Sequence, residues 1–324
     1  MPAISVIIPV HGVEDYLERC LDSVLGQGDT RDIEVIAVDD ASPDRCGQIL
    51  AARRDRRLRV ITNATAAGPG RAREQGAKEA TGEYLWFVDG DDELAAGAIA
   101  AVAADLERLR PDVLIVDYEN LYPDGGTSPS GGDLSGPEVT TLAERPGLIN
   151  LTMTVWSKIF RRDFLAGLGA AFGPGIHEDV PVSAAALLAA GRIGLLNRVC
   201  YRYRRLRRGS FMAQASDRHF DIFTSYARVF SERTVAPPVR AAVFERAIWH
   251  YTTVLPLVPR GRRREFFGRM TADFRRWRPP EFAFPPGPRG AKLRLVARGA
   301  YGAYLVLNPL NRMRIALRGR TAAP

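Results

Sequence analysis

Three carboxylates follow a short apolar segment in the N-terminal third of the chain. Residues 84–88 (YLWFV) run directly into Asp89, Asp91 and Asp92. An apolar run of this length between glycines predicts a buried strand, which would place the acids at the edge where open α/β sheets bind ligands. Oxygen ligands this close together suit a hard divalent cation shared with substrate phosphates. The alternative is a polar turn after a strand.

The segments that must position these acids alternate between strand and helix patterns. This alternation predicts βαβ units, right-handed crossovers and a Rossmann-like, mostly parallel sheet flanked by helices, in the α/β class. A second acidic pair, Asp39 and Asp40, would lie at the same sheet edge. Strands are predicted at 4–10, 33–38, 58–62, 84–88 and 113–116, and helices at 17–25, 43–57, 71–80 and 95–109.

Six short segments share their order and spacing with a known family across residues 3–212. They are 5–10 (SVIIPV), 38–44 (VDDASPD), 70–76 (GRAREQG), 82–92 (GEYLWFVDGDD), 156–158 (WSK) and 177–179 (HED). Together they resemble family 2 glycosyltransferases. The resemblance implies a GT-A fold, an inverting mechanism and a nucleotide-sugar donor.

The resemblance also assigns roles to individual acids. It makes Asp91 the ligand of a divalent cation, Mn²⁺ or Mg²⁺, and places Asp89 near the donor ribose or the metal. It places Asp179 at the position of the catalytic base, which requires hydrogen-bond reach to the acceptor hydroxyl. The structural alternative for Asp179 is a helix N-cap.

Donor and acceptor contacts are expected on both halves of this region. An Asp can accept a hydrogen bond from a uracil N–H, which favours a UDP-sugar, with a guanine or thymine nucleotide as the alternative. Arg side chains pair with phosphate bidentately. A solvated basic face is the alternative for part of the arginine-rich segment 201–210. The expected donor-binding residues are Pro9, Val10, His11, Glu14, Asp40, Arg73, Asp89, Gly90, Arg204, Arg208 and Ser210. The expected acceptor-binding residues are Trp156, Lys158, His177 and Glu178, although a lone His is more often structural.

The chain divides into three predicted regions. Residues 1–212 form the glycosyltransferase domain, with a donor half at about 1–118 and an acceptor half at about 137–212, separated by a Gly-, Ser- and Pro-rich loop. A helical extension follows at 213–280 and a basic amphipathic tail at 281–324. Residues 259–324 contain 16 Lys and Arg but 3 acids. This pattern favours an anionic membrane surface, with packing on the protein or a linker as alternatives.

Composition limits the remaining classes. The chain has 324 residues, is 46% hydrophobic and contains three cysteines without metal-ligand spacing, which indicates a reducing cytoplasm and no disulfide framework. No uninterrupted apolar run reaches about 18 residues, so we expect no transmembrane helix. No nucleic-acid-binding motif accompanies the basic tail. We therefore expect a cytoplasmic protein that can lie at the inner face of the membrane.

The expected function is metal-assisted transfer of a sugar from a nucleotide donor to a hydroxyl of a glycan or glycopolymer. Bacterial cell-surface polysaccharides and teichoic-acid-type polymers are the expected products, by analogy within the family. A nucleotidyltransferase is one alternative, but it would need a Gly-rich phosphate loop where residues 11–14 (HGVE) stand. A binding module without turnover is another, and the intact Asp89, Asp91 and Asp179 argue against it.

Overall fold

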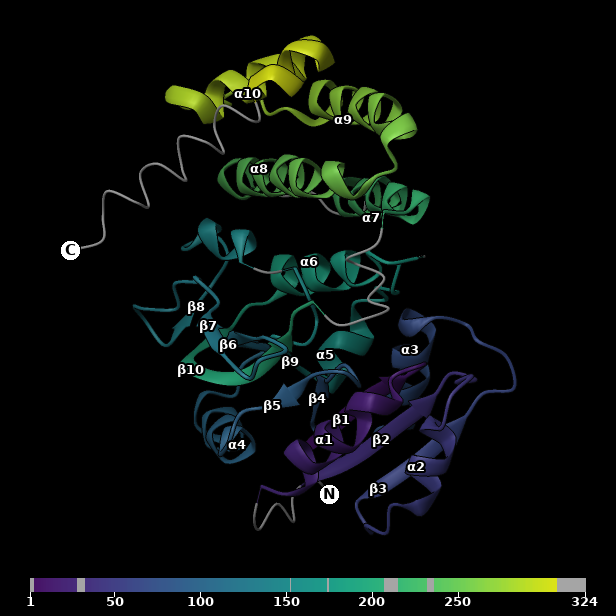
Figure 1. Ribbon diagram of the computed structural model, residues 1–324. Coiled ribbons are helices and arrows are strands. Elements are labelled where there is room, and N and C mark those ends of the chain that lie inside the picture. Colours follow the sequence, from purple (N-terminus) through teal and green to yellow (C-terminus); the bar gives the residue numbers. More distant parts are fainter. Residues whose placement is uncertain are drawn as a thin grey trace, which may run out of the picture.

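A computed structural model describes residues 3–27, 33–151, 153–173, 175–206, 215–231 and 236–307. One ten-stranded sheet with helices on both faces forms the lower part of the molecule, and a layer of helices from the C-terminal third lies above it (Figure 1). The sheet order is β3-β2-β1-β4-β9-β6-β10-β5, with β7 paired to β6 and β8 to β10.

The N-terminal half of the sheet is parallel. Its central strand β1 is apolar at nearly every position because both of its faces are covered. Ile7 points into a core shared with α3, whereas Val6 and Ile8 point into a core shared with α1. Strand β1 pairs in parallel with β2 and β4, and β2 pairs in parallel with β3. The elements are β1 (Ile4–Val10), α1 (Glu14–Leu25), β2 (Ile33–Asp39), α2 (Cys46–Ala52), β3 (Leu58–Thr62), α3 (Pro69–Glu79) and β4 (Tyr84–Phe87).

The second half of the sheet is mixed. Strand β9 lies between β4 and β6 and is antiparallel to both, whereas β10 is parallel to β6. An antiparallel strand needs no helical crossover, so β9 can be inserted at the centre of the sheet by an irregular connection. The elements are β5 (Glu93–Leu94), α4 (Ala98–Leu109), β6 (Val113–Leu121), β7 (Thr127–Pro129), β8 (Val139–Thr140), β9 (Lys158–Arg161), α5 (Arg162–Gly167), α6 (Asp179–Ala189) and β10 (Ile193–Arg204).

The expected α/β class and helix-flanked sheet are confirmed, with three differences of detail. Parallel pairing prevails only in the N-terminal half. Helix α2 is shorter than the predicted 43–57. Part of the predicted loop after residue 121 is a hairpin, in which β6 turns back onto β7. Gly125 supplies the positive φ of +82° that this turn requires.

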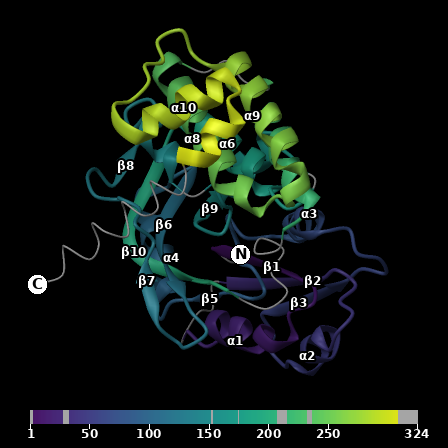
Figure 2. The same ribbon diagram turned by 45° about the horizontal axis from the view of Figure 1, so that its top comes forward.

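The C-terminal helices share one hydrophobic core with the sheet. Val180 and Leu187 of α6 join Ile115 below and Tyr226 and Phe244 above in a continuous cluster. Turning the molecule shows the helical layer over this face (Figure 2). Its elements are η2 (Asp217–Phe220), α7 (Asp221–Ser231), α8 (Pro237–Val254), η3 (Leu255–Leu257), η4 (Arg260–Arg262), α9 (Arg263–Trp277) and α10 (Gly287–Arg298). The short helix η1 (Pro146–Asn150), from the middle of the chain, packs against α8.

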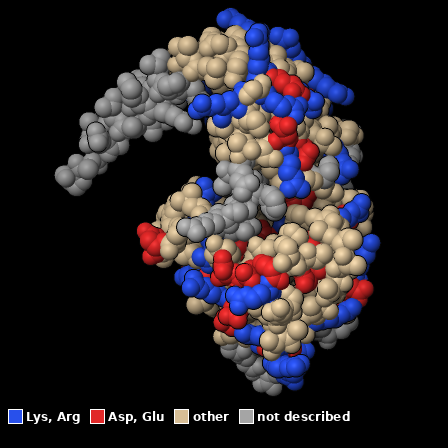
Figure 3. Space-filling view, turned by 45° about the vertical axis from the view of Figure 1, so that its right-hand side comes forward, with Lys and Arg blue, Asp and Glu red and all other residues tan. Residues whose placement is uncertain are grey.

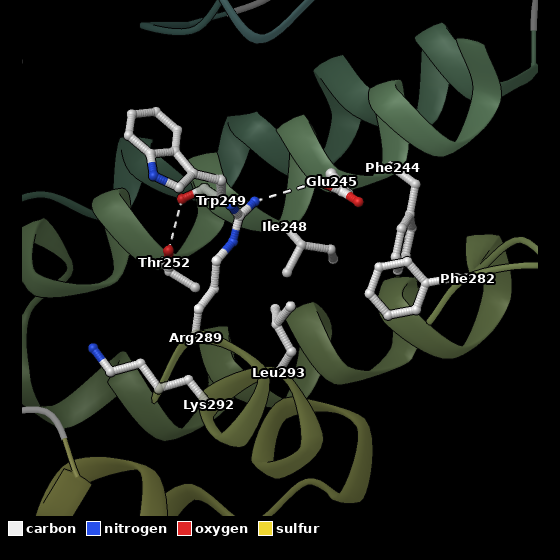
Figure 4. Close-up of a pocket in the computed structure, with 9 residues that line it drawn as sticks. All are labelled: Phe244, Glu245, Ile248, Trp249, Thr252, Phe282, Arg289, Lys292 and Leu293. Carbon is white, nitrogen blue, oxygen red and sulfur yellow. Dashed lines mark hydrogen bonds and ion pairs between the residues drawn. The ribbon is translucent and has the colours of Figure 1, made fainter. Parts of the chain in front are cut away.

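Helix α10, at the start of the predicted tail, packs on α8 and α9. The ring of Tyr304, which follows α10, lies 5.1 Å from that of Phe267 on α9. On the α8 side, Arg289 pairs with Glu245 at 3.4 Å, and Leu293 faces Ile248 across a small apolar pocket (Figure 4). The described part of the tail is therefore attached to the helical layer.

Basic side chains gather over this helical layer (Figure 3). Among the described helices, none is both long and apolar enough to cross a membrane.

Candidate active site

The acidic segment after β4 is held tightly against β1. The backbone N–H of Val88 donates to the carbonyl of Ile7 at 2.9 Å. A Cβ on Gly90 would lie 3.1 Å from the carbonyl oxygen of Pro9, so a side chain there would push the segment away from β1. The residues expected to contact the donor at the end of β1, including Pro9 and Val10, therefore adjoin the acids.

Asp89, Asp91 and Asp92 form a compact carboxylate cluster. One oxygen from each lies within 4.8 Å of the others. Burial, followed by the negative charges of Asp91 and Asp89, raises the pKa of Asp92 well above its usual value. Three oxygen ligands with mutually repelling charges suit a hard divalent cation such as Mn²⁺ or Mg²⁺.

Strand β10 holds the cluster from the other side. Tyr201 donates its hydroxyl to Asp92 at 2.7 Å, and the backbone N–H of Arg204 donates to the second Asp92 oxygen at 2.7 Å. The Arg204 guanidinium donates to the carbonyl of Asp91 at 2.8 Å and pairs with Glu93. Arg204, expected to bind the donor, thus supports the acidic segment. The expected donor residues Arg208 and Ser210 lie outside the described residues.

A buried arginine joins the acidic cluster to the start of α6. Arg73 is 4% exposed and pairs with Asp89 at 2.6 Å and with Glu178 at 2.5 Å. Arg73 was expected to contact the donor, and Glu178 the acceptor. The structure places both in an ionic bridge between two segments of the site, and their contacts with donor and acceptor stay predictions.

Asp179 is the first residue of α6, and its neighbour Glu178 occupies the N-cap position without a capping side-chain bond. Burial, followed by the negative charge of Glu178, raises the pKa of Asp179 to about 8, although the positive charges of Arg73 and Lys158 act in the opposite direction. A carboxylate with a pKa near the working pH is well suited to general-base chemistry.

Lys158 is fully buried beside Asp179. Its ammonium donates to the carbonyl of Thr154 at 2.8 Å and to the hydroxyl of Ser157 at 3.3 Å. Burial lowers the pKa of Lys158 to about 7, against an opposing effect of Asp179. Lys158, expected to touch the acceptor, therefore lies where its charge acts on Asp179.

His177 belongs to a histidine cluster under the helical layer. It is 2% exposed, its Nε2 lies 3.4 Å from Nδ1 of His219, and its ring centroid lies 5.3 Å from that of His250. Burial, then the charge of His219, lowers the pKa of His177 to about 3. A neutral, enclosed imidazole serves packing, and acceptor contact through His177 stays a prediction.

Among the residues expected to contact the nucleotide base, Asp40 holds the loop before α3. Asp40 is buried and accepts from the N–H of Gly68 at 2.7 Å and from the amide of Asn63 at 2.9 Å. His11 is exposed, with Nδ1 2.8 Å from the Asp40 carbonyl. Glu14 pairs with Arg45 at 3.0 Å. Asp40 therefore shapes this loop, and the contacts of Asp40, His11 and Glu14 with the nucleotide base stay predictions.

An aromatic group lies on the other side of the acids. Trp156, expected to bind the acceptor, stacks on Tyr201 at 4.5 Å and on Tyr203 at 5.2 Å between ring centroids. A cleft of about 620 Å³ opens beside Trp156 and Tyr203, and α8 forms its far wall.

Sequence reasoning missed the contribution of α8. Arg246, Trp249, His250 and Thr253 line the cleft from this helix. Their spacing of three, four and seven residues places them on one helical face, which is a visible signal. Only the packing of α8 shows that this face turns toward the sheet.

Comparisons with known proteins agree with this geometry. The family model "Glycosyl transferase family 2" matches residues 5–166. An uncharacterized glycosyltransferase, EpsJ of Bacillus subtilis, is 32% identical over 213 residues, which cover 63% of this chain and 61% of that protein. The poly(ribitol-phosphate) beta-N-acetylglucosaminyltransferase TarS of Staphylococcus aureus is 32% identical over 220 residues, covering 66% of this chain and 38% of TarS.

The fold is likewise shared with a solved structure. The crystal structure of S. aureus TarS 1-349 in complex with UDP-GlcNAc matches with a TM-score of 0.78 and 23% identity, over 97% of this chain and 92% of that one. This likeness confirms the GT-A fold. With half of the sequence matched by the family model, the chain belongs to glycosyl transferase family 2.

Proposed function

We propose that this chain transfers a sugar, with inversion, from a UDP-sugar to a hydroxyl of a cell-surface glycopolymer of the teichoic-acid type. The observation that carries the proposal is the position of Asp179, a poised base that Glu178 and Arg73 connect to the acidic cluster at Asp89. Family membership supports the reaction class. The printed substrate of TarS and its complex with UDP-GlcNAc support the donor and acceptor classes.

The reaction requires one bond to form while another breaks. The acceptor oxygen bonds to the anomeric carbon from the face opposite the diphosphate, the bond from that carbon to the diphosphate oxygen breaks, and the acceptor proton moves to Asp179. Attack from the opposite face inverts the configuration. Lys158 and Arg73 lower the pKa of Asp179 and so favour its carboxylate form.

Asp91 and Asp89 are the residues that we propose to hold a divalent cation, with Asp92 behind them. A bound Mn²⁺ or Mg²⁺ would neutralise charge on the leaving diphosphate. The Arg204 guanidinium holds Asp91 by donating to its backbone carbonyl, and the Tyr201 hydroxyl holds Asp92 by donating to its carboxylate. Among the described residues, this cluster has the oxygen ligands that such an ion prefers.

Substitution of Asp91 tests the proposal. We expect Asp91→Asn to fold normally but to lose Mn²⁺-dependent turnover of UDP-GlcNAc, measured as UDP release, and to bind Mn²⁺ more weakly by calorimetry. Glu107→Gln removes an exposed acid of α4 and is the matched control. Unchanged metal-dependent turnover in folded Asp91→Asn would falsify the assignment.

We also propose that the helical layer contacts an anionic membrane at its cytoplasmic side. Arg294 and Arg298 of α10 are exposed, and Leu305 and Val306 beyond it are 43% and 67% exposed. Each basic residue near an anionic surface contributes about 1 kcal/mol. Co-sedimentation with phosphatidylglycerol vesicles, but not with phosphatidylcholine vesicles, is expected, and it should weaken with salt. Equal sedimentation with both would contradict this contact.

A further inference from the structure

The proposed catalytic base follows a segment that packs against one face of α3. This segment, residues 172–173 and 175–178, is called the base segment. Glu74 of α3 accepts a hydrogen bond at 3.1 Å from the backbone N–H of Phe172, where the segment begins. The Glu74 side chain is 19% exposed, and its other carboxylate oxygen pairs with Arg71 at 2.7 Å. Glu74 therefore connects α3 to the start of the base segment.

The two ends of the base segment meet in space. The backbone N–H of Gly173 donates to the carbonyl of Glu178 at 2.7 Å. A Cβ on Gly70 of α3 would lie 2.9 Å from Cβ of Phe172 and 3.1 Å from Cγ of Glu178, so the helix touches both ends at once. Because the ends are joined, a bond that fixes Phe172 also fixes the residue before α6. The first residue of α6 is Asp179.

Three residues of α3 share the contact with the base segment. Gly70, Arg73 and Glu74 are spaced by three and four residues, which places them on one face of the helix. Gly70 allows the close approach, Arg73 pairs with Glu178, and Glu74 holds the backbone. Arg73 is also paired with Asp89, so its substitution would disturb the acidic cluster as well. Substitution of Glu74 instead tests the hold on the base segment by itself.

The N-terminal end of α3 is attached to the edge expected to bind the nucleotide. Gly68 is the N-cap of α3, and its N–H donates to Asp40 at 2.7 Å. The N–H of Ala67 donates to the same carboxylate at 3.0 Å. Ala72 in the middle of the helix is buried in one core with Ile7 of β1. Helix α3 therefore relates the donor-binding edge to the base segment through a packed, fixed element.

We infer that Glu74 is a positioning residue, which fixes Asp179 relative to the donor by holding the base segment on α3. The base must lie within hydrogen-bond reach of the acceptor hydroxyl. A displacement of about 1 Å at the reacting groups can lower the rate about 10²-fold, even when the substitution is remote. The inference rests on the proposed function and adds a residue that acts on the base without touching either substrate.

Three substitutions of Glu74 in the full chain separate its hydrogen bond from its charge. Glu74→Ala removes the acceptor but suits a helix, and we expect kcat to fall about 10- to 100-fold. Glu74→Asp keeps the charge but is one methylene too short to reach the N–H of Phe172, so kcat should fall similarly. Glu74→Gln keeps the length and an acceptor oxygen and should retain most of the kcat. The affinity for UDP, measured by calorimetry, should be unchanged in all three.

The assay is UDP release from UDP-GlcNAc with a synthetic ribitol-phosphate oligomer as acceptor. At pH 9 about nine tenths of Asp179 is ionised, so a loss of kcat there reports position rather than protonation. Arg71→Gln is the matched control, because it removes the exposed ion-pair partner of Glu74 and leaves the hydrogen bond to the base segment. It should change kcat little. Urea unfolding of each variant shows that the fold is retained.

Wild-type kcat in folded Glu74→Ala would overturn the inference. A loss in Glu74→Gln as large as in Glu74→Asp would also overturn it, because charge or size rather than the hydrogen bond would then matter. This pair decides the question even if Glu74→Ala does not fold. Equal losses of UDP affinity and kcat would move the effect to the donor edge and overturn the positioning role. A wild-type protein that binds UDP-GlcNAc but never transfers its sugar would instead refute the proposed function.

Discussion

The ionisation of Asp179 should determine how transfer depends on pH. Burial raises its pKa to about 8, and a base acts only as the carboxylate. With this pKa, about one tenth of the enzyme is competent at pH 7 and about nine tenths at pH 9. We therefore expect kcat/KM to rise about tenfold between these pH values, with an apparent pKa near 8.

Replacing the acid should separate chemistry from binding and stability. Asp179→Asn is expected to lower kcat by about 10² to 10⁴-fold, the usual contribution of a positioned base, while donor affinity persists. The pKa of Asp179 is higher in the folded than in the unfolded chain, so its protonated form favours folding. This contribution to the free energy of unfolding is full below about pH 4 and is lost as the pH rises through 8. At about 1.4 kcal/mol for each pKa unit, the lost free energy of unfolding reaches about 4 kcal/mol at pH 7. Asparagine does not ionise and avoids this loss, so Asp179→Asn should unfold at a higher urea concentration than the wild type at pH 7.

The assay is UDP release at saturating and limiting donor from pH 6 to 9.5, beside urea unfolding at each pH. Asp273→Asn is the matched control, because Asp273 is a partly buried acid of α9 that accepts from Tyr251 at 2.8 Å, away from the site. A flat wild-type profile between pH 7 and 9, or equal losses of donor affinity and turnover in Asp179→Asn, would refute the assignment.

Three further predictions concern the framework of the site. Arg73→Gln leaves Asp89 and Glu178 without their shared guanidinium and should lower the free energy of unfolding by about 3–5 kcal/mol. Substitution of the exposed Arg71 by Gln should change the free energy of unfolding by less than about 1 kcal/mol, and similar urea curves for the two variants would contradict the role of the buried bridge. Burial keeps His177 neutral in the fold with a pKa of about 3, so its contribution to the free energy of unfolding is full above about pH 6.5 and falls by about 2 kcal/mol at pH 5. His177→Phe should remove this part of the loss of stability between pH 7 and pH 5, and an unaltered difference between the urea curves at these two pH values would count against the reasoning. Phe267→Ala should cost about 3–5 kcal/mol by leaving a cavity under Tyr304, and an unchanged melting temperature would show that α10 and the segment after it add nothing to the fold.

Local patterns in the sequence predicted the elements that present the acids. The five apolar residues before Asp89 and the period of the first helix are short-range signals, because each depends on neighbours within a few residues. The α/β class, the acidic edge and the order of the motifs all follow from such signals. They also led to the family, which the comparisons confirm.

Contacts between distant segments could not be predicted in this way. Arg73 and Glu178 are 105 residues apart, and Tyr201 and Asp92 are 109 apart, so no local pattern reveals either pair. The antiparallel position of β9 likewise depends on which strands compete for its edges. Residues assigned to ligands by motif, such as Arg73 and Arg204, are in the structure ion-paired with the site's own acids.

The pKa values of the groups at the site depend most on their burial, which is a property of the fold and cannot be read from the sequence. In an unfolded chain a carboxylate and an ammonium have ordinary pKa values, whereas burial in the fold moves the pKa of Asp179 to about 8 and that of Lys158 to about 7. The sequence alone determined which groups are present and which strand or helix carries them. Tertiary packing decided which groups meet, which of them lose water and which face of α8 lines the cleft, because desolvation and long-range charge interactions exist only once the chain has folded.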